Sequence, residues 1–168
     1  IAWNTTLVDV TVDDSGIISV LDSTWCRVFQ YTQDGDMLGV FGGIGTTCGT
    51  FSSPSALESL NGQILVLDKL KGTITTFVPT AYRELLGQAL AYYTEGNYQA
   101  SIDLWQQVLK YNSNMPLAYK SIGKAYMQQE RPKEALENLR MAGDRESYSL
   151  VYGQLRQAFF QRNIVWIL

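Results

Sequence analysis

Strand-like runs, with alternating apolar and polar residues or with β-branched apolar residues, are separated by turn sequences through the first half of the chain, which predicts β-structure. Residues 7–12 alternate in this way, and residues 17–21 form a β-branched apolar run. Turn sequences such as Asn61-Gly62, which tolerates positive φ at both positions, separate these runs. The predicted strands cover residues 7–12, 17–21, 26–31, 37–41, 55–60, 63–67 and 73–78.

This β pattern repeats after 46 residues, because Gly-Ile-Ile-Ser-Val-Leu-Asp at 16–22 returns as Gly-Gln-Ile-Leu-Val-Leu-Asp at 62–68. The first cycle predicts four strands, and the second predicts three before Pro79. Short, evenly spaced antiparallel strands favour a β-sandwich or a β-propeller. Since a propeller has roughly four or more blades, we expect two cycles to be the C-terminal end of a longer ring.

From about residue 82 the apolar residues recur at helical spacing. Residues 82–110 predict a helix, a turn and a helix, and residues 116–142 repeat this pattern after 34 positions. Gly96 and Glu130 occupy matching turn positions, and Tyr92 and Tyr126 occupy matching core positions. Residues 147–163 predict a further helix that covers the open end of the array. The sequence thus predicts an α+β protein with two segregated domains, residues 1–79 and 80–168.

The first β cycle resembles an NHL repeat. Residues 14–22 give a glycine turn and an apolar strand ending in aspartate, residues 27–31 read Arg-Val-Phe-Gln-Tyr, and residues 41–43 read Phe-Gly-Gly. The second cycle matches at residues 61–68 but lacks the arginine and the closing Phe-Gly-Gly. This resemblance covers residues 7–78 and implies β-propeller blades, which in that family bind proteins, nucleic acids or small ligands.

The helical half resembles tetratricopeptide (TPR) repeats over residues 82–145. Small residues Ala89 and Gly123 match the close helix contact, and Ala135 matches the second helix, whereas Ser101 replaces the usual alanine. The resemblance implies a groove lined by the first helix of each pair, which binds a protein or peptide segment. The matching groove positions chosen as a candidate site are Leu90, Tyr93, Lys120, Lys124 and Gln128.

Lys120 and Lys124 give this groove its chemical character. They lie one helical turn apart and share a face, so they could hold an acidic or carboxylate-ended peptide. The alternative is a pair of solvated lysines on a helix surface. Leu86 and Leu90 stand where the family's carboxylate clamp has polar residues, which argues against that particular use.

Composition excludes several chemistries. The chain has no histidine, so it lacks the commonest general base and metal ligand. Residues 1–81 carry three basic and eight acidic side chains, and residues 82–168 carry ten and eight. Neither half contains the dense basic stripe that a nucleic acid requires. We therefore expect no catalytic residue, no metal site, no cofactor and no nucleic-acid partner.

Four residues and one segment leave alternatives open. Cys26 and Cys48 are either two small apolar side chains or a disulfide of an extracytoplasmic protein. The glycine-rich stretch 42–49 lacks the spacing of a phosphate-binding loop and favours a connection between blades. Asp22 and Asp68 end equivalent strands, so they are either a paired acid and base or, as recurrence favours, acceptors of hydrogen bonds from the next turn.

These observations predict a non-enzymatic scaffold that binds a protein partner. The chain is similar to large bacterial surface or membrane proteins with this domain order, so we expect an extracytoplasmic or membrane-anchored location. Residues 164–168 form an apolar run that either opens a membrane span or buries against the array. Exposed blade edges would favour self-association. The alternative function is a propeller hydrolase or lactonase whose metal-dependent channel lies in further N-terminal blades.

Overall fold

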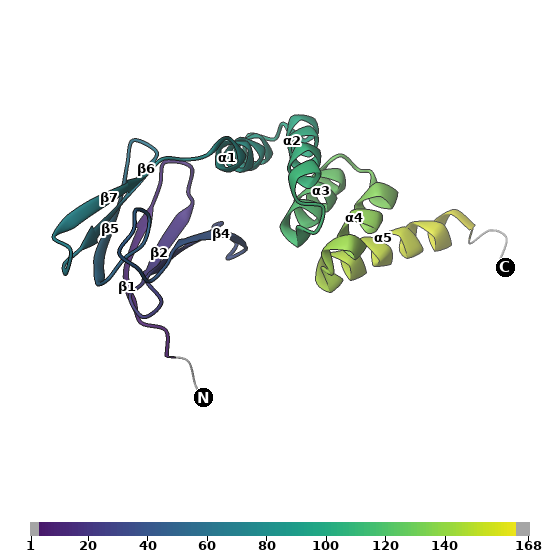
Figure 1. The fold of residues 1–168 in the computed structure, drawn as a ribbon. Coiled ribbons are helices and arrows are strands. Elements are labelled where there is room, and N and C mark those ends of the chain that lie inside the picture. Colours follow the sequence, from purple (N-terminus) through teal and green to yellow (C-terminus); the bar gives the residue numbers. More distant parts are fainter. Residues whose placement is uncertain (1–3, 164–168) are drawn as a thin grey trace. The chain divides into compact units, whose positions relative to one another are not determined.

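A computed structural model of the protein describes residues 4–163 (Figure 1). Within these residues, seven β-strands precede five α-helices. The chain forms two compact units, Ile1–Arg83 and Glu84–Leu168, and the boundary falls in the first turn of α1 (Ala81–Thr94). The change of period near residue 82 therefore marks a real change from antiparallel sheets to helices, which confirms the predicted α+β class.

The first unit contains two antiparallel sheets. The first sheet has the strand order β1-β2-β3-β4 and the second has the order β5-β6-β7, so each strand pairs with its neighbour in sequence. Within the described residues, four strands are thus followed by three, as the two cycles predict. The strands are β1 (Leu7–Val12), β2 (Ile18–Asp22), β3 (Arg27–Tyr31), β4 (Met37–Gly42), β5 (Pro54–Leu60), β6 (Gln63–Asp68) and β7 (Thr73–Phe77).

The turns repeat with the strands. Gly16 before β2 has φ +76°, and Gly62 before β6 has φ +74°. Before β3 and β7 the corresponding residues are Cys26 at φ 55° and Gly72 at φ 64°. Both cycles therefore have a left-handed residue before the second strand and before the third strand. Glycine occupies three of these four positions, and Cys26 occupies the fourth.

The core of this unit lies between the two sheets. Leu21, Val28 and Phe41 of the first sheet belong to one apolar cluster with Leu57, Ile64, Val66 and Phe77 of the second, and Cys26 and Phe51 complete it. The Phe41 and Phe77 rings pack with their centroids 4.6 Å apart. At the same junction the Leu57 backbone N–H donates to Asp9 Oδ2 at 2.7 Å. Side chains of β1 thus satisfy part of the backbone of β5.

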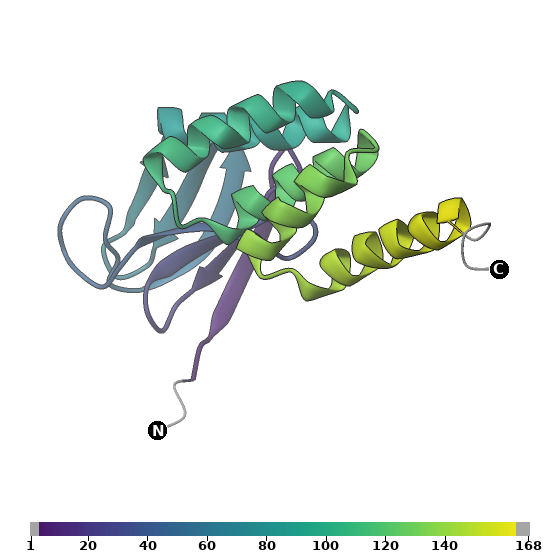
Figure 2. The ribbon, with the colours of Figure 1, turned by 90° about the vertical axis from the view of Figure 1, so that its right-hand side faces the viewer.

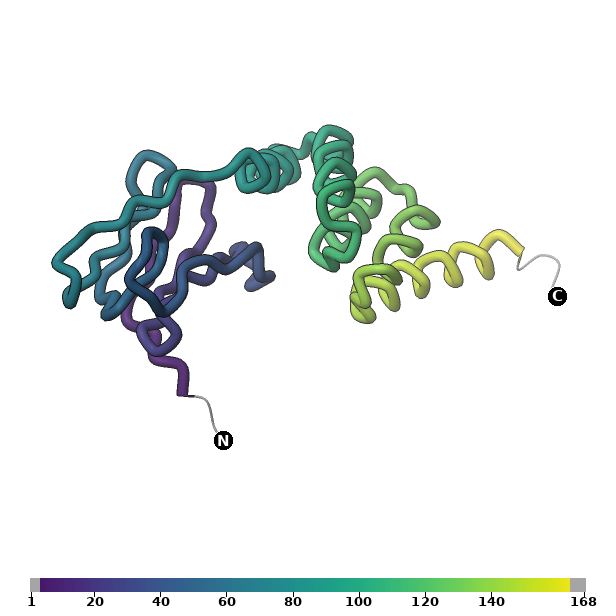
Figure 3. The backbone as a smooth tube through the Cα atoms, viewed as in Figure 1, coloured from purple at the N-terminus to yellow at the C-terminus, as the bar shows by residue number. Residues whose placement is uncertain are grey.

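The second unit is an array of helices. Most of α1 belongs to it, followed by α2 (Tyr98–Tyr111), α3 (Pro116–Gln128), α4 (Pro132–Ala142) and α5 (Arg145–Asn163). In the array α2 packs on α3, α3 on α4, and α4 on α5. Figure 3 follows the chain through these antiparallel helices and their short connections.

The two helical hairpins share their turn geometry. Gly96, between α1 and α2, has φ +80°, and Glu130, between α3 and α4, has φ +57°. The turn positions matched in the sequence therefore adopt the same left-handed backbone. Tyr126 packs against the α4–α5 cluster, and its ring centroid lies 4.5 Å from the Arg131 guanidinium carbon, whereas its counterpart Tyr92 is 37% exposed. The core position predicted from the repeat holds only for the second hairpin, where α5 adds a further layer.

Contacts within each hairpin depend on small residues. In the second hairpin a Cβ placed on Gly123 would lie 2.7 Å from Leu139 Cγ, so only glycine fits there without movement. In the first hairpin the Ser101 hydroxyl donates to the Ala89 carbonyl at 2.7 Å in a fully buried position. The serine that departs from the repeat pattern is accommodated because its hydroxyl has this partner.

Only the first part of α5 packs on the array. Val151 is buried with Leu139 of α4, and Tyr148 packs beside them. Leu150 and Phe159 of the same helix are exposed, so the predicted covering helix does not bury all of its apolar residues. The reason is length, because α4 has 11 residues and α5 has 19, so the last turns of α5 extend past α4 (Figures 1 and 2).

Within residues 4–163, no helix combines the length and the apolar composition that crossing a membrane requires. The apolar run 164–168, predicted either to open a membrane span or to bury against the array, lies outside the described residues.

Candidate partner-binding surface

The α3 helix brings three of the five candidate residues onto one stripe. Lys120, Lys124 and Gln128 are spaced by four residues, so each lies about one turn above the last. Both lysines are half-buried, and Gln128 is exposed near the end of the helix. The lysine stems therefore pack along the array, a common arrangement in which the ammonium groups stay near solvent.

The carboxylate of Asp144 interacts electrostatically with Lys120 and Lys124. Asp144 precedes α5 and caps it, since Ser147 N–H donates to its Oδ1 at 3.0 Å and the Ser147 hydroxyl donates to its Oδ2 at 2.8 Å. Burial raises the pKa of Asp144, but these two hydrogen bonds and the attraction of Lys120 and Lys124 outweigh it and lower the pKa. The two ammonium groups thus already attract one carboxylate of the chain.

The other two candidate residues lie on α1. Leu90 and Tyr93 are half-buried, and the Tyr93 ring meets the Tyr98 ring of α2 edge-on, with centroids 5.5 Å apart. Tyr93 therefore supports the packing of the first hairpin. The lysine stripe and these two residues come from the first helix of each pair, as the repeat predicts.

The sequence alone does not identify Asp144 as part of this surface. Gly143, which has φ +70° and caps the end of α4, and Asp144, which precedes α5, give a recognisable local signal for a helix junction. Nothing in the local sequence shows that this junction lies close to two lysines of α3. Proximity of the carboxylate depends on how α5 packs back onto the array.

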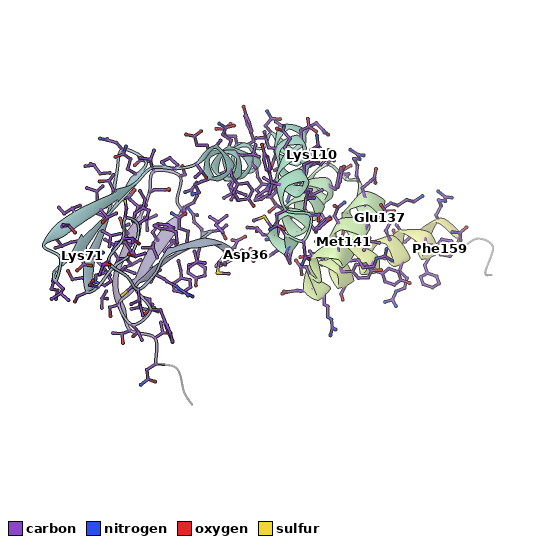
Figure 4. All side chains as sticks on the ribbon, viewed as in Figure 1. Asp36, Lys71, Lys110, Glu137, Met141 and Phe159 are labelled. Carbon is purple, nitrogen blue, oxygen red and sulfur yellow. The ribbon has the colours of Figure 1, made fainter. Side chains whose placement is uncertain are left out.

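A shallow hollow of about 480 Å³ lies on a different helix. Residues of α2 alone line it, namely Asp103, Gln106, Gln107, Lys110 and Tyr111. Figure 4 labels Lys110 on this helix. None of the five candidate residues borders this hollow, and its open, polar lining does not resemble an enclosed ligand pocket.

The two aspartates that end equivalent strands hold turns. Asp68 accepts hydrogen bonds from the backbone N–H groups of Ser52, Ser53, Leu70 and Lys71, at 2.6, 3.2, 3.0 and 3.1 Å. Asp22 accepts from Thr6 and Thr24, and its buried Oδ2 has no hydrogen-bond partner within the described residues. These contacts support the turn interpretation over a paired acid and base.

The hydrogen bonds to Asp68 also lower the pKa of its carboxyl group. Burial raises the pKa of Asp68, but the amides of Ser52, Lys71, Ser53 and Leu70 outweigh it, so the pKa lies below its ordinary value. Nearby, Lys71 Nζ donates to the Thr50 carbonyl at 2.8 Å. An aspartate kept ionised in this way holds a turn and is a poor proton donor.

The two cysteines are free thiols in different environments. Cys26 is buried and Cys48 is exposed, so the disulfide alternative is wrong for this structure. Burial of Cys26, reinforced by the charges of Asp68 and Asp22, raises the pKa of its thiol. The Cys26 thiol is therefore protonated and inert at neutral pH.

We expect iodoacetamide at neutral pH to modify Cys48 and leave Cys26 intact, because only the exposed thiol is accessible. Intact-mass measurement should show one adduct per native chain and two after unfolding in guanidinium. A Cys48→Ser variant is the control and should remain unmodified while folded. Rapid modification of Cys26 in the native chain would contradict the buried position of this residue.

Other candidate chemistry is accounted for by the fold. The glycine-rich stretch leaves β4, makes a bridge between Ile44 and Phe51, and leads into β5 of the second sheet. It is thus a connection between sheets. Across the part of the chain that the structure describes, no group of three or more cysteine, aspartate or glutamate side chains is placed to hold a metal ion.

Comparison with known protein families gives a match for part of the helical unit. A family model described as TPR repeat matches residues 89–130, which run from the middle of α1 through α2 and α3 to the turn at Glu130. No curated protein matches the sequence. The family match supports the tetratricopeptide part of the resemblance and the role of such repeats in protein–protein interaction, and the NHL resemblance of the first unit stays a prediction.

Proposed function

We propose that this chain is a non-catalytic interaction module whose helical unit binds a segment of a partner protein. The match of a TPR repeat to residues 89–130 carries the proposal. The geometry of that segment supports it, because the matched region contains Gly123, whose missing side chain lets α3 approach α4 closely. Tetratricopeptide arrays generally present such helices to peptides, and their function is recognition.

The surface that we assign to the partner consists of Leu90, Tyr93, Lys120, Lys124 and Gln128. Its apolar and aromatic end lies on α1, and its basic stripe lies on α3. The two lysines favour an acidic or carboxylate-ended segment. A carboxylate of the partner would compete with Asp144 for them.

Charge reversal on α3 tests this assignment. A fluorescently labelled peptide with a run of glutamates and a free C-terminal carboxylate serves as the probe, and anisotropy gives its Kd. We expect Lys120→Glu combined with Lys124→Glu to weaken binding by about tenfold or more, since two attractions become repulsions. Lys133→Glu together with Lys110→Glu is the matched control, because both residues are exposed and lie on other helices. Equal Kd values for the two double variants would refute the assignment.

Neutralising Asp144 should have the opposite effect. Asparagine is as good a helix cap as aspartate, so Asp144→Asn should leave α5 folded while removing the competing charge. We expect the same peptide to bind about threefold more tightly, in line with the small free energy of a solvent-accessible ion pair. Circular dichroism should show unchanged helicity. Weaker binding with an intact helix would mean that Asp144 assists recognition.

We also propose that the first unit is part of an NHL-type propeller in a larger extracytoplasmic or membrane-anchored protein. The resemblance over residues 7–78 and the two sheets packed face to face support this setting. Fractionation of cells that make the native protein checks its location, and recovery with the cytoplasmic proteins would refute the proposed setting.

A further inference from the structure

The hairpin between β5 and β6 reverses direction at two residues, Asn61 and Gly62. Leu60 and Gln63 pair on either side of them, so these two residues form the whole turn. Both have positive φ, 51° at Asn61 and 74° at Gly62, which is the backbone of a tight two-residue hairpin. Both residues are also solvent-exposed. A water-accessible asparagine side chain therefore lies directly before a glycine.

An asparagine in this position can react with its own backbone, because the nitrogen of the next residue can attack the side-chain carbonyl carbon. Three conditions favour the attack. The nitrogen should not be shielded by a Cβ, its N–H should not be held in a hydrogen bond, and the carboxamide should be free to turn toward it. Gly62 meets the first condition, and its backbone also leaves the turn conformation more easily than any other residue.

The second condition separates Gly62 from five other turn glycines with positive φ. The N–H groups of those five donate to backbone carbonyls three or four residues earlier, at 2.9 to 3.1 Å, and the glycines are Gly16, Gly35, Gly72, Gly96 and Gly143. Within residues 4–163, no hydrogen bond holds the Gly62 N–H. Its nitrogen is therefore available where those of the comparable turns are not.

The third condition separates Asn61 from asparagines that the fold restrains. Asn97 Oδ1 accepts from the Ala100 N–H at 3.4 Å, and Asn138 Nδ2 donates to the Glu134 carbonyl at 2.9 Å. Among the described residues, no hydrogen-bond partner restrains the Asn61 carboxamide in this way. Asn61 is also followed by glycine, as no other asparagine of the chain is.

We propose that Asn61 is a site of spontaneous covalent modification, at which asparagine becomes aspartate and isoaspartate. The Gly62 nitrogen forms a bond to Asn61 Cγ and gives up its proton, the bond from Cγ to Nδ2 breaks, and Nδ2 leaves as ammonia. Water then opens the five-membered imide at either carbonyl carbon. The sum is amide plus water giving acid plus ammonia, so nothing is oxidised or reduced. This inference concerns the β5–β6 turn and does not depend on the function proposed for the helices.

The two products should differ in their effect on the first unit. Opening at the former main-chain carbonyl gives isoaspartate, in which the backbone runs through the side chain and is longer by one carbon atom. A longer backbone does not fit a two-residue turn whose flanking residues are paired. Since β5 and β6 supply Leu57, Ile64 and Val66 to the core, we expect this product to lose stability. Aspartate tolerates the left-handed conformation and should keep the turn.

Peptide mapping by mass spectrometry tests the proposal on the full chain, after incubation in mildly alkaline buffer under native conditions. We expect the peptide that contains Asn61 to gain mass as its amide becomes an acid. A protein isoaspartate methyltransferase should label the same peptide. Peptides that contain Asn97 and Asn138 are internal controls and should keep their amides.

Two variants assign the reaction to this turn. Asn61→Gly removes the reacting carboxamide and keeps a residue that accepts positive φ, so the methyltransferase label should disappear. Gly62→Ala shields the nitrogen, and its new Cβ meets no atom within 4 Å, so modification of Asn61 should be largely lost without a steric clash. Circular dichroism checks that both variants are folded, and Asn61→Gly alone carries the test if the positive φ destabilises Gly62→Ala.

Three results would overturn the proposal. The first is an Asn61 that keeps its amide as long as Asn97 does. The second is modification that appears only after urea unfolds the chain, because the folded turn would then protect the residue. The third is conversion to aspartate without isoaspartate, which would mean direct hydrolysis and no attack by Gly62.

Urea unfolding of the separated products tests the consequence for stability. The Asn61→Asp variant has the new charge without the longer backbone and should unfold like the wild type. The isoaspartate form should unfold at a lower urea concentration than this variant. Equal midpoints would refute the inferred loss of the turn.

Discussion

Replacing Asp68 by asparagine is expected to destabilise the first unit by on the order of 3 kcal/mol. The carboxylate accepts hydrogen bonds from four backbone amides of two turns, and an asparagine amide can accept at only one of its two terminal atoms. Urea unfolding measures the loss. Hydrogen exchange should show faster exchange at Ser52 and Ser53, the amides on the strand-to-strand connection.

Asp22→Asn is the matched control, because Asp22 ends the equivalent strand but accepts from only two amides. We expect it to cost roughly half as much. A difference of the opposite sign would contradict the assignment of the Asp68 bonds as the stabilising element.

The pH dependence gives an independent check. The folded-state pKa of Asp68 is lowered, so its contribution is fully present above the unfolded-state pKa, about 3.9, and is lost as pH falls through the folded pKa. The stability difference between wild type and Asp68→Asn should therefore be constant near neutral pH and shrink below about pH 4. A difference that stays constant down to the acid unfolding of the chain would refute the role of the ionised carboxylate.

Gly123→Ala is expected to destabilise the helical unit by about 2 kcal/mol, although alanine is the better helix former. The new Cβ would lie 2.7 Å from Leu139 Cγ, 2.8 Å from Leu139 Cδ2 and 3.3 Å from the Leu139 backbone nitrogen. Since a backbone atom is among these neighbours, side-chain rotation alone cannot relieve the contact, and α3 must move away from α4. Urea unfolding followed by circular dichroism measures the loss.

Gly153→Ala in α5 is the control for this substitution. A Cβ at Gly153 meets no other atom within 4 Å, so only the helix propensity changes, and the variant should be more stable by about 0.5–1 kcal/mol. If both variants stabilise the protein, the tight α3–α4 approach is not a constraint on the fold.

Much of the fold follows from the periodicities in the sequence. The 46-residue repeat predicts two cycles with four strands and three strands, and the structure has these strands. The 34-residue repeat predicts matching turns, and Gly96 and Glu130 both have positive φ. Local signals succeed here because strand alternation, turn residues and helix periodicity each act over a few residues.

The candidate site could be predicted only in part. The helical period places Lys120 and Lys124 on one face, because four residues make about one turn. The proximity of Asp144 depends on the direction in which α5 leaves the Gly143 junction, and this direction is set by the packing of Val151 on Leu139. The extent of that packing depends in turn on the relative lengths of α4 and α5, and no short-range pattern fixes such a contact.

The hydrogen bond from Leu57 N–H to Asp9 has a consequence for handling the protein in vitro. An unoccupied row of amides on an outer strand can recruit extended chains and start a cross-β fibril. Here the Asp9 carboxylate occupies one of those amides, so the strand is a poor template while the unit stays folded. Conditions that keep the unit folded should therefore slow fibril formation.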